Sequence, residues 1–184
     1  YKGQISVIVA DRFANMHPDD AASSPRALTY FVPKTQVGMG AAEAFIIDGI
    51  GYDYWALPWE RLEAIADLNE TIAVILAEGE VVWADSEADR ARFYSLKKRL
   101  FKNLADPQYV CRILAQRLEE AMEIFKNMAF EEDIGKLRVG ARFIGISLSD
   151  AIAAVNGTYV KCGECGTDDP APLLKRLQNV PEHY

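Results

Sequence analysis

The sequence has only three cysteines and no hydrophobic run long enough to cross a membrane. Three cysteines are too few for the disulfide framework of a small secreted domain. The longest apolar run, ISVIVA at residues 5–10, has the length of a strand, whereas a bilayer-spanning helix needs roughly 18 residues. A basic leader with an apolar core and a cleavage site is also absent. Because the sequence begins at Tyr1 rather than at Met, residues before it are left open. These absences predict a protein of the reducing cytoplasm with no membrane partner.

Positive charge is also scarce, since 20 basic side chains stand against 27 acidic ones and the formal net charge is −7. Such a balance repels nucleic acid at long range, so a nucleic-acid partner is not expected. A small phosphorylated ligand remains open, because a local cluster of cations or a bound Mg²⁺ would set the field that such a ligand meets.

Few residues offer nucleophilic or zinc chemistry. The two histidines, His17 and His183, are not accompanied by a G-x-S-x-G nucleophile motif, so a hydrolase triad has no support. Cys162 and Cys165 have the spacing of a zinc or redox pair. A structural zinc requires four ligands, however, and no second pair of this spacing exists. The simplest interpretation is a glycine-containing turn.

The first half of the chain alternates short apolar runs with turn residues. The runs are rich in β-branched and aromatic side chains and predict strands at residues 4–10, 27–32, 43–47, 51–57 and 80–84. Between the last two strands, residues 59–68 and 70–78 have helical periodicity, with Pro58 at the start. This pattern predicts a small α/β domain over residues 1–84.

The second half has the start signals and periodicity of helices. Ser86 begins a capping box, and Asp106 and Asp169 are each followed by proline, which is typical of a helix N-terminus. Between residues 132 and 155 the apolar residues keep a nearly heptad spacing. Long helices with short connections predict an antiparallel bundle over residues 85–184. The predicted fold class is therefore α+β, a small mixed sheet with flanking helices followed by a helical bundle.

Asp53 is the carboxylate that this organisation singles out. It lies within an otherwise apolar and aromatic strand that leads into a helix, and side chains near such strand ends are held firmly yet remain reachable. A carboxylate there either binds a cation or forms a salt bridge. The residues around Asp53 do not choose between these roles.

Three stretches carry a resemblance to a known family. They are YFVPKT at 30–35, FIIDGIGYDYWALPWERLEAIADL at 45–68 and SEADRARFYSLKKRL at 86–100. In this order they resemble nucleotidyltransferases of the kanamycin (aminoglycoside) type, within the polymerase-beta-like superfamily, which carry a HEPN-like helical half. The resemblance implies that Asp53 is a catalytic carboxylate and a ligand of Mg²⁺. It also implies transfer of a nucleoside monophosphate from a nucleoside triphosphate to a small hydroxylated acceptor.

Other marks of that family are missing. The first strand is not followed by a Gly-Ser pair, and Arg26 and Leu28 occupy the positions where the resemblance implies two further aspartates. Three alternatives follow. The protein is a degenerate, non-catalytic nucleotidyltransferase, or an unrelated α+β protein, or an active enzyme in which Asp11, Asp19, Asp20 or Asp48 substitutes as a ligand.

Without those aspartates, three cationic residues are the candidates to bind a triphosphate. Arg12, Arg26 and Lys34 flank the first two predicted strands, and arginine forks suit phosphate oxygens. Taken singly, each residue fits ordinary surface charge that balances nearby acids better than it fits a phosphate contact. A non-catalytic module that binds a nucleotide or a partner protein is therefore the alternative to an enzyme. A structural role as a homodimer would rest on the near-heptad helix of residues 132–155.

Overall fold

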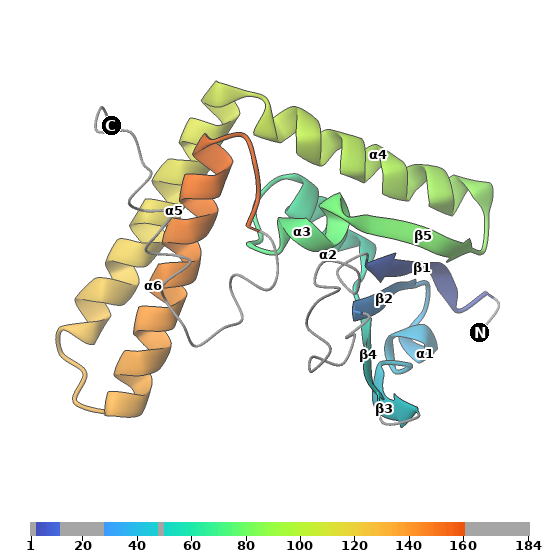
Figure 1. Cartoon of the computed structure of the whole chain (residues 1–184), viewed down its shortest axis with the longest axis horizontal. Coiled ribbons are helices and arrows are strands. Elements are labelled where there is room, and N and C mark those ends of the chain that lie inside the picture. The colour runs from blue at the N-terminus through green and yellow to red at the C-terminus, as the bar shows by residue number, and fades with distance from the viewer. Residues whose placement is uncertain (1–2, 12–27, 48–49, 161–184) are drawn as a thin grey trace. The chain divides into compact units, whose positions relative to one another are not determined.

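The computed structural model describes residues 3–11, 28–47 and 50–160 (Figure 1). By its internal contacts the chain divides into two compact units, Tyr1–Phe101 and Lys102–Tyr184. The sheet and the shorter helices belong to the first unit, and two long helices belong to the second. The predicted domain boundary after residue 84 stays a prediction, because the division of the contacts falls within a helix.

The first unit is built on one five-stranded mixed sheet (Figure 1). The strand order is β3-β4-β2-β1-β5, and every neighbouring pair is antiparallel except β2 with β4. Each strand lies within about a residue of its predicted position, so the fold class α+β is confirmed. The strands are β1 (Ile5–Asp11), β2 (Leu28–Pro33), β3 (Glu43–Ile47), β4 (Ile50–Ala56) and β5 (Gly79–Ala84).

Helices fill the connections between the strands. The short helix α1 (Gln36–Met39) was not expected from the sequence, and it begins where Thr35 Oγ1 accepts a hydrogen bond from the Gly38 amide. Helices α2 (Trp59–Ala66) and α3 (Ala73–Ala77) confirm the two predicted segments before β5. Buried apolar side chains from β1, β2, α2, α3 and β5, together with Leu57 after β4, form the core: Val7, Val9, Tyr30, Phe31, Val32, Leu57, Leu62, Ile65, Leu76 and Val81.

Helix α4 (Glu87–Leu104) contacts α2 and β5. Arg92 Nη2 lies 2.9 Å from Glu63 Oε1 and its guanidinium stacks on the Trp59 ring, while Lys97 Nζ donates to the Gly79 carbonyl at 2.9 Å. The apolar face of α4 is buried. The sequence predicted this helix as part of the bundle, whereas Arg92, Lys97 and Arg99 contact residues of the first unit.

The second unit is an antiparallel hairpin of α5 (Pro107–Met128) and α6 (Ile134–Val155), which lie side by side (Figure 1). The aspartates before each helix, Asp106 and Asp133, accept hydrogen bonds from backbone amides of the first turn. Asp106 thereby confirms the predicted cap. Neither long helix, nor any other in the described part of the chain, has the length and hydropathy needed to cross a bilayer.

The seam, by which we mean the surface along which α5 and α6 pack on each other, does not run along the apolar residues of nearly heptad spacing on α6. The buried residues of α6 are small or polar, among them Ser147, Asp150 and Ala151, and a Cβ on Gly140 would lie 2.6 Å from Met128 Sδ. Small residues let the helices approach closely. The apolar residues that keep a nearly heptad spacing in the sequence are exposed or only half buried: Ile134, Leu137, Ala141, Ile144, Leu148, Ile152 and Val155.

The packing around Gly79 generates a stability prediction. A Cβ there would press on the Ile75 carbonyl oxygen and lie 2.8 Å from Val9 Cγ1. We expect Gly79→Ala to lower the free energy of unfolding by about 1–3 kcal/mol, since neither neighbour can move without disturbing the core. Urea unfolding followed by circular dichroism measures the change.

A matched glycine on α6 supplies the control. Nothing lies within 4 Å of a Cβ built on Gly145, so Gly145→Ala should raise stability by about 0.5–1 kcal/mol through helix propensity alone. Equal effects of the two substitutions would contradict the close packing at Gly79.

Candidate functional site

Asp53 lies in the middle of β4, between two strands. Its backbone partners are Leu28, the first residue of β2, and Ala44 of β3. Leu28 therefore occupies the position beside Asp53 where the family resemblance implies an aspartate. Neither of these two backbone partners is a carboxylate residue, and the metal site itself stays a prediction.

Asp11 is a sequence-predicted carboxylate that the sheet brings to the same end as Asp53. It ends β1 opposite Gly79, and the preceding residue pairs with Thr29, the neighbour of Leu28. Because β2 separates β1 from β4, the two aspartate backbones stand two strand spacings apart, about 10 Å. Mg²⁺ takes six oxygens in near-octahedral geometry. Asp11 and Asp53 would therefore form only part of such a site.

The other residues that the sequence predicted for this site lie outside the described residues. They are Arg12 and Arg26 among the cations, and Asp19, Asp20 and Asp48 among the replacement ligands. His17, His183, Cys162 and Cys165 also lie outside them. Among the residues that the structure describes, no group of three or more histidines, cysteines, aspartates and glutamates is arranged to hold a metal ion.

Lys34 lies beyond the opposite end of β2 from Leu28. The two residues are six positions apart along the strand, which is about 20 Å. The Lys34 ammonium lies 2.7 Å from Asp85 Oδ2 and 2.9 Å from Asp89 Oδ2, just before and within the first turn of α4. Hydrogen bonds to Asp85 and then Asp89 raise the pKa of Lys34. Lys34 thus joins β2 to the start of α4, and its predicted contact with phosphate stays a prediction.

A buried polar group accompanies Asp53 on β4. Trp55 follows two residues later, and its ring lies 5.8 Å from the Tyr30 ring. The Trp55 indole N–H is buried and meets no acceptor among the described residues. Since a buried donor without a partner is costly, this N–H marks a place for a hydrogen-bond acceptor beside the strand that carries Asp53.

The second unit holds a separate cluster of buried charge. Arg117 on α5 is 5% exposed, and its side chain lies 2.9 Å from Glu120 Oε2 and 3.6 Å from Asp150 Oδ2 on α6. Burial raises the pKa of Asp150 to about 6, against the opposing effect of the Arg117 charge. Burial also pushes the pKa of Glu120 upward, but hydrogen bonds from Arg117 and Gln116 outweigh it and hold that pKa below its ordinary value.

Sequence reasoning missed this cluster. A charged residue inside an apolar helical stripe was the available signal, since Arg117 stands between Leu114 and Ala121 on one face of α5. The pairing with Asp150 could not be foreseen, because the seam of α6 runs through small residues rather than through its large aliphatic stripe. A buried carboxylate with a raised pKa is a candidate functional group.

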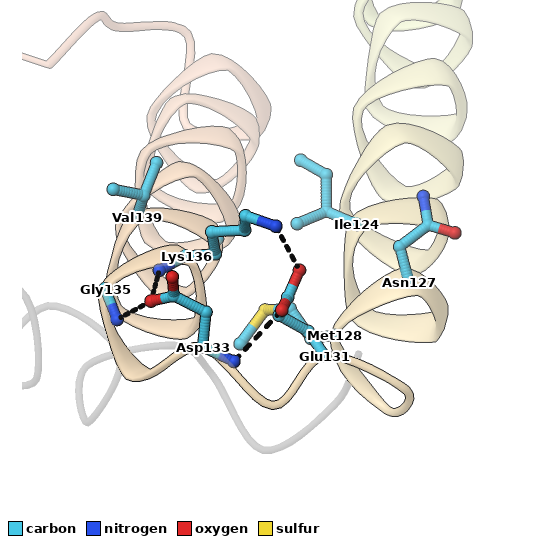
Figure 2. Close-up of a pocket in the computed structure, with 9 residues that line it drawn as sticks. Ile124, Asn127, Met128, Glu131, Asp133, Gly135, Lys136 and Val139 are labelled. Atoms are coloured by element: carbon cyan, nitrogen blue, oxygen red, sulfur yellow. Dashed lines mark hydrogen bonds and ion pairs between the residues drawn. The ribbon is translucent and has the colours of Figure 1, made fainter.

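A groove lies at the closed end of the hairpin, between the last turns of α5 and the first turns of α6 (Figure 2). It has a volume of about 530 Å³. Ile124, Met128 and Val139 give it an apolar wall, and Figure 2 shows Lys136 reaching the Glu131 carboxylate, 3.3 Å away. Hydrogen bonds from the Asp133 backbone and from Lys136 lower the pKa of Glu131. The groove holds an ion pair but no nucleophile beside a base, so it fits contact with an apolar group rather than chemistry.

Comparisons with known proteins give little further support. No family model matches the chain, and no curated protein matches it. A solved nucleotidyltransferase-like protein from Exiguobacterium sibiricum 255-15 is similar over 98% of this chain, with 13% sequence identity and a TM-score of 0.42. The chain spans 63% of the length of that protein. A likeness this weak carries no conclusion about the site.

The buried carboxylate generates a pH prediction. The pKa of Asp150 is about 6 in the folded state, whereas an unfolded aspartate has a pKa of about 3.9. Between these values the folded state keeps the proton and the unfolded state loses it. The free energy of unfolding should therefore fall as the pH rises from about 4 to 6. In Asp150→Asn this fall should be absent, so the variant gains up to about 3 kcal/mol relative to wild type across the window.

Urea unfolding of both proteins at pH 4, 5, 6 and 7 measures the difference. A difference between variant and wild type that stays constant with pH would show that Asp150 is ionised in the folded protein throughout.

Proposed function

We propose that the unit Tyr1–Phe101 is a nucleotidyltransferase-like domain that binds a nucleoside triphosphate and does not transfer a nucleotide. One observation carries the proposal: the strands that flank Asp53 present Leu28 and Ala44, not carboxylates. Metal-assisted transfer needs carboxylates that converge on Mg²⁺ to neutralise the triphosphate. With Asp53 lacking such neighbours, this stabilisation is lost.

Binding without a metal requires another source of positive charge. Arg12 directly follows Asp11 in the sequence, and Arg26 precedes Leu28 by two residues. Arginine forks bind phosphate oxygens directly and with two hydrogen bonds, so Arg12 and Arg26 replace Mg²⁺ as the groups that meet the phosphates. The Trp55 indole N–H, buried near Asp53, supplies a donor for a ligand acceptor.

A second candidate function is an active enzyme, and the position of Asp11 favours it. Asp11 and Asp53 lie at one end of the sheet on strands separated only by β2. If further oxygens join them, they could hold Mg²⁺ for transfer of a nucleoside monophosphate to a small hydroxylated acceptor. In that case Asp53 is a catalytic metal ligand. The net charge of −7 suits a cationic acceptor, because opposite charges concentrate the ligand.

Calorimetric titration of the full chain with ATP, first with Mg²⁺ and then with EDTA, separates these functions. For the non-catalytic domain we expect similar affinity in both buffers. Asp53→Asn should not weaken binding, and Arg26→Ala should weaken it by about 10-fold or more, the loss of a charged hydrogen bond. For the enzyme, binding should require Mg²⁺, and Asp53→Asn and Asp11→Asn should each abolish it.

Lys34→Gln is the matched variant at the other end of β2. Unchanged affinity would assign Lys34 to the ion pairs with Asp85 and Asp89 alone, and a loss equal to that of Arg26→Ala would return it to the phosphate site. Absence of binding for all four ribonucleoside triphosphates in both buffers would contradict both functions.

A further inference from the structure

The α5–α6 hairpin carries two apolar stripes that do not belong to its seam. On α5 the stripe consists of Leu114, Leu118, Met122 and Phe125, and on α6 of Leu137, Ile144, Leu148 and Val155. Successive residues of an α-helix are turned by about 100° around the helix axis. Around its own axis, each stripe lies about 60–140° away from the residues that face the other helix, and the direction of this turn is the same on both helices. Because the helices are antiparallel, rotation in the same sense brings both stripes to one side. We call this side of the hairpin the apolar face.

The apolar face is strongly exposed on α5. Leu118 is 43% exposed, Met122 is 52% and Phe125 is 61%, and Phe130 in the connection after α5 is 91% exposed. Single exposed apolar residues are ordinary, but a contiguous row along one helix is typical of an interface. The opposite side of α5 is polar, with Gln116, Glu120, Glu123 and Asn127. On α5 the large exposed apolar residues therefore lie on one face.

The stripe on α5 is nearly symmetric about Met122. Leu118 lies four residues before Met122 and Phe125 three residues after it, while Leu114 and Phe130 each lie eight residues away. Two charged residues that flank the stripe are also nearly symmetric about Met122: Glu119 precedes it by three residues and Lys126 follows it by four. In an antiparallel pair of α5 helices that cross at Met122, each apolar residue meets another and each Glu119 lies beside a Lys126.

The stripe on α6 is symmetric about the same level of the hairpin. Ile144 and Leu148 lie two residues on either side of position 146, and Leu137 and Val155 lie nine residues on either side of it. Contacts across the seam fix the level: Arg117 meets Asp150, and Gly140 meets Met128. Met122 therefore stands beside the centre of the α6 stripe.

We propose that a second copy of this chain covers the apolar face, with a two-fold axis at the level of Met122 and perpendicular to the helices. A two-fold interface requires a self-complementary surface, in which residue i meets residue j and residue j meets residue i. Both stripes and the flanking charges satisfy this requirement about one centre. The two hairpins then form a four-helix arrangement in which α5 packs on the partner's α5 and α6 on the partner's α6.

Sedimentation velocity of the full chain tests the pairing. We expect a dimer at micromolar concentration, and Met122→Glu should weaken dimerisation by at least about 10-fold, because it places two like charges against each other at the axis. Val139→Glu is the control. Val139 is 55% exposed, close to the value for Met122, but it lies on the other side of α6, so this variant should dimerise like wild type.

A charge exchange tests the geometry. Glu119→Lys and Lys126→Glu should each weaken the dimer by roughly tenfold, since each sets like charges side by side twice in the interface. The double variant should restore wild-type affinity. A monomeric wild-type chain, with the face covered by its own first unit or by a different protein, would overturn the proposal. A dimer that survives Met122→Glu, or single variants that the double variant does not rescue, would do the same.

Discussion

The parallel pairing of β2 with β4 is the constraint on which the rest of the first unit depends. Every other strand pair in the sheet is antiparallel, so this one pair decides which ends of the central strands meet. It sets Leu28 beside Asp53 and Phe31 beside Ala56. It also brings Tyr54 close enough to stack on Phe31, with ring centroids 4.4 Å apart. The register of β2 on β4 therefore sets both the neighbours of Asp53 and the packing of the aromatic rings.

That register places Lys34 far from Asp53, although the sequence predicted both for one ligand site. The Asp53 end of the sheet gathers the end of β1 and the beginning of β2, while Lys34 lies a full strand length away. Lys34 is held there by two aspartates that also belong to the start of α4, where Asp89 accepts from the Ser86 hydroxyl at 2.7 Å. Its cation thereby orders a junction within the first unit. Such ion pairs contribute modestly to stability when partly exposed, but they fix geometry.

The hairpin reverses the ordinary arrangement of an amphipathic helix pair. On α6 the seam contains Gly140, Ser147 and Asp150, which lies beside the buried Arg117 of α5, while the large aliphatic and aromatic side chains of α6 are exposed or half buried. Breaking a buried ion pair leaves an uncompensated charge, so such pairs specify one partner and one register. The close approach at Gly140 has the same effect. The seam thus fixes how α5 and α6 pair, and the outer face leaves apolar surface exposed. Both features suit a hairpin that packs on a second copy of the chain.

The sequence by itself determined the five strands and the starts of the long helices. Alternating apolar residues located all five strands, and Asp106 with Pro107 located the start of α5, because periodicity and capping are local properties of the chain. Only the tertiary structure decided that Leu28 and Ala44 flank Asp53, that Lys34 turns to Asp85 and Asp89, and that Asp150 rather than the aliphatic stripe enters the seam. These outcomes depend on register and on how closely two backbones approach, and residues far apart in the chain set both.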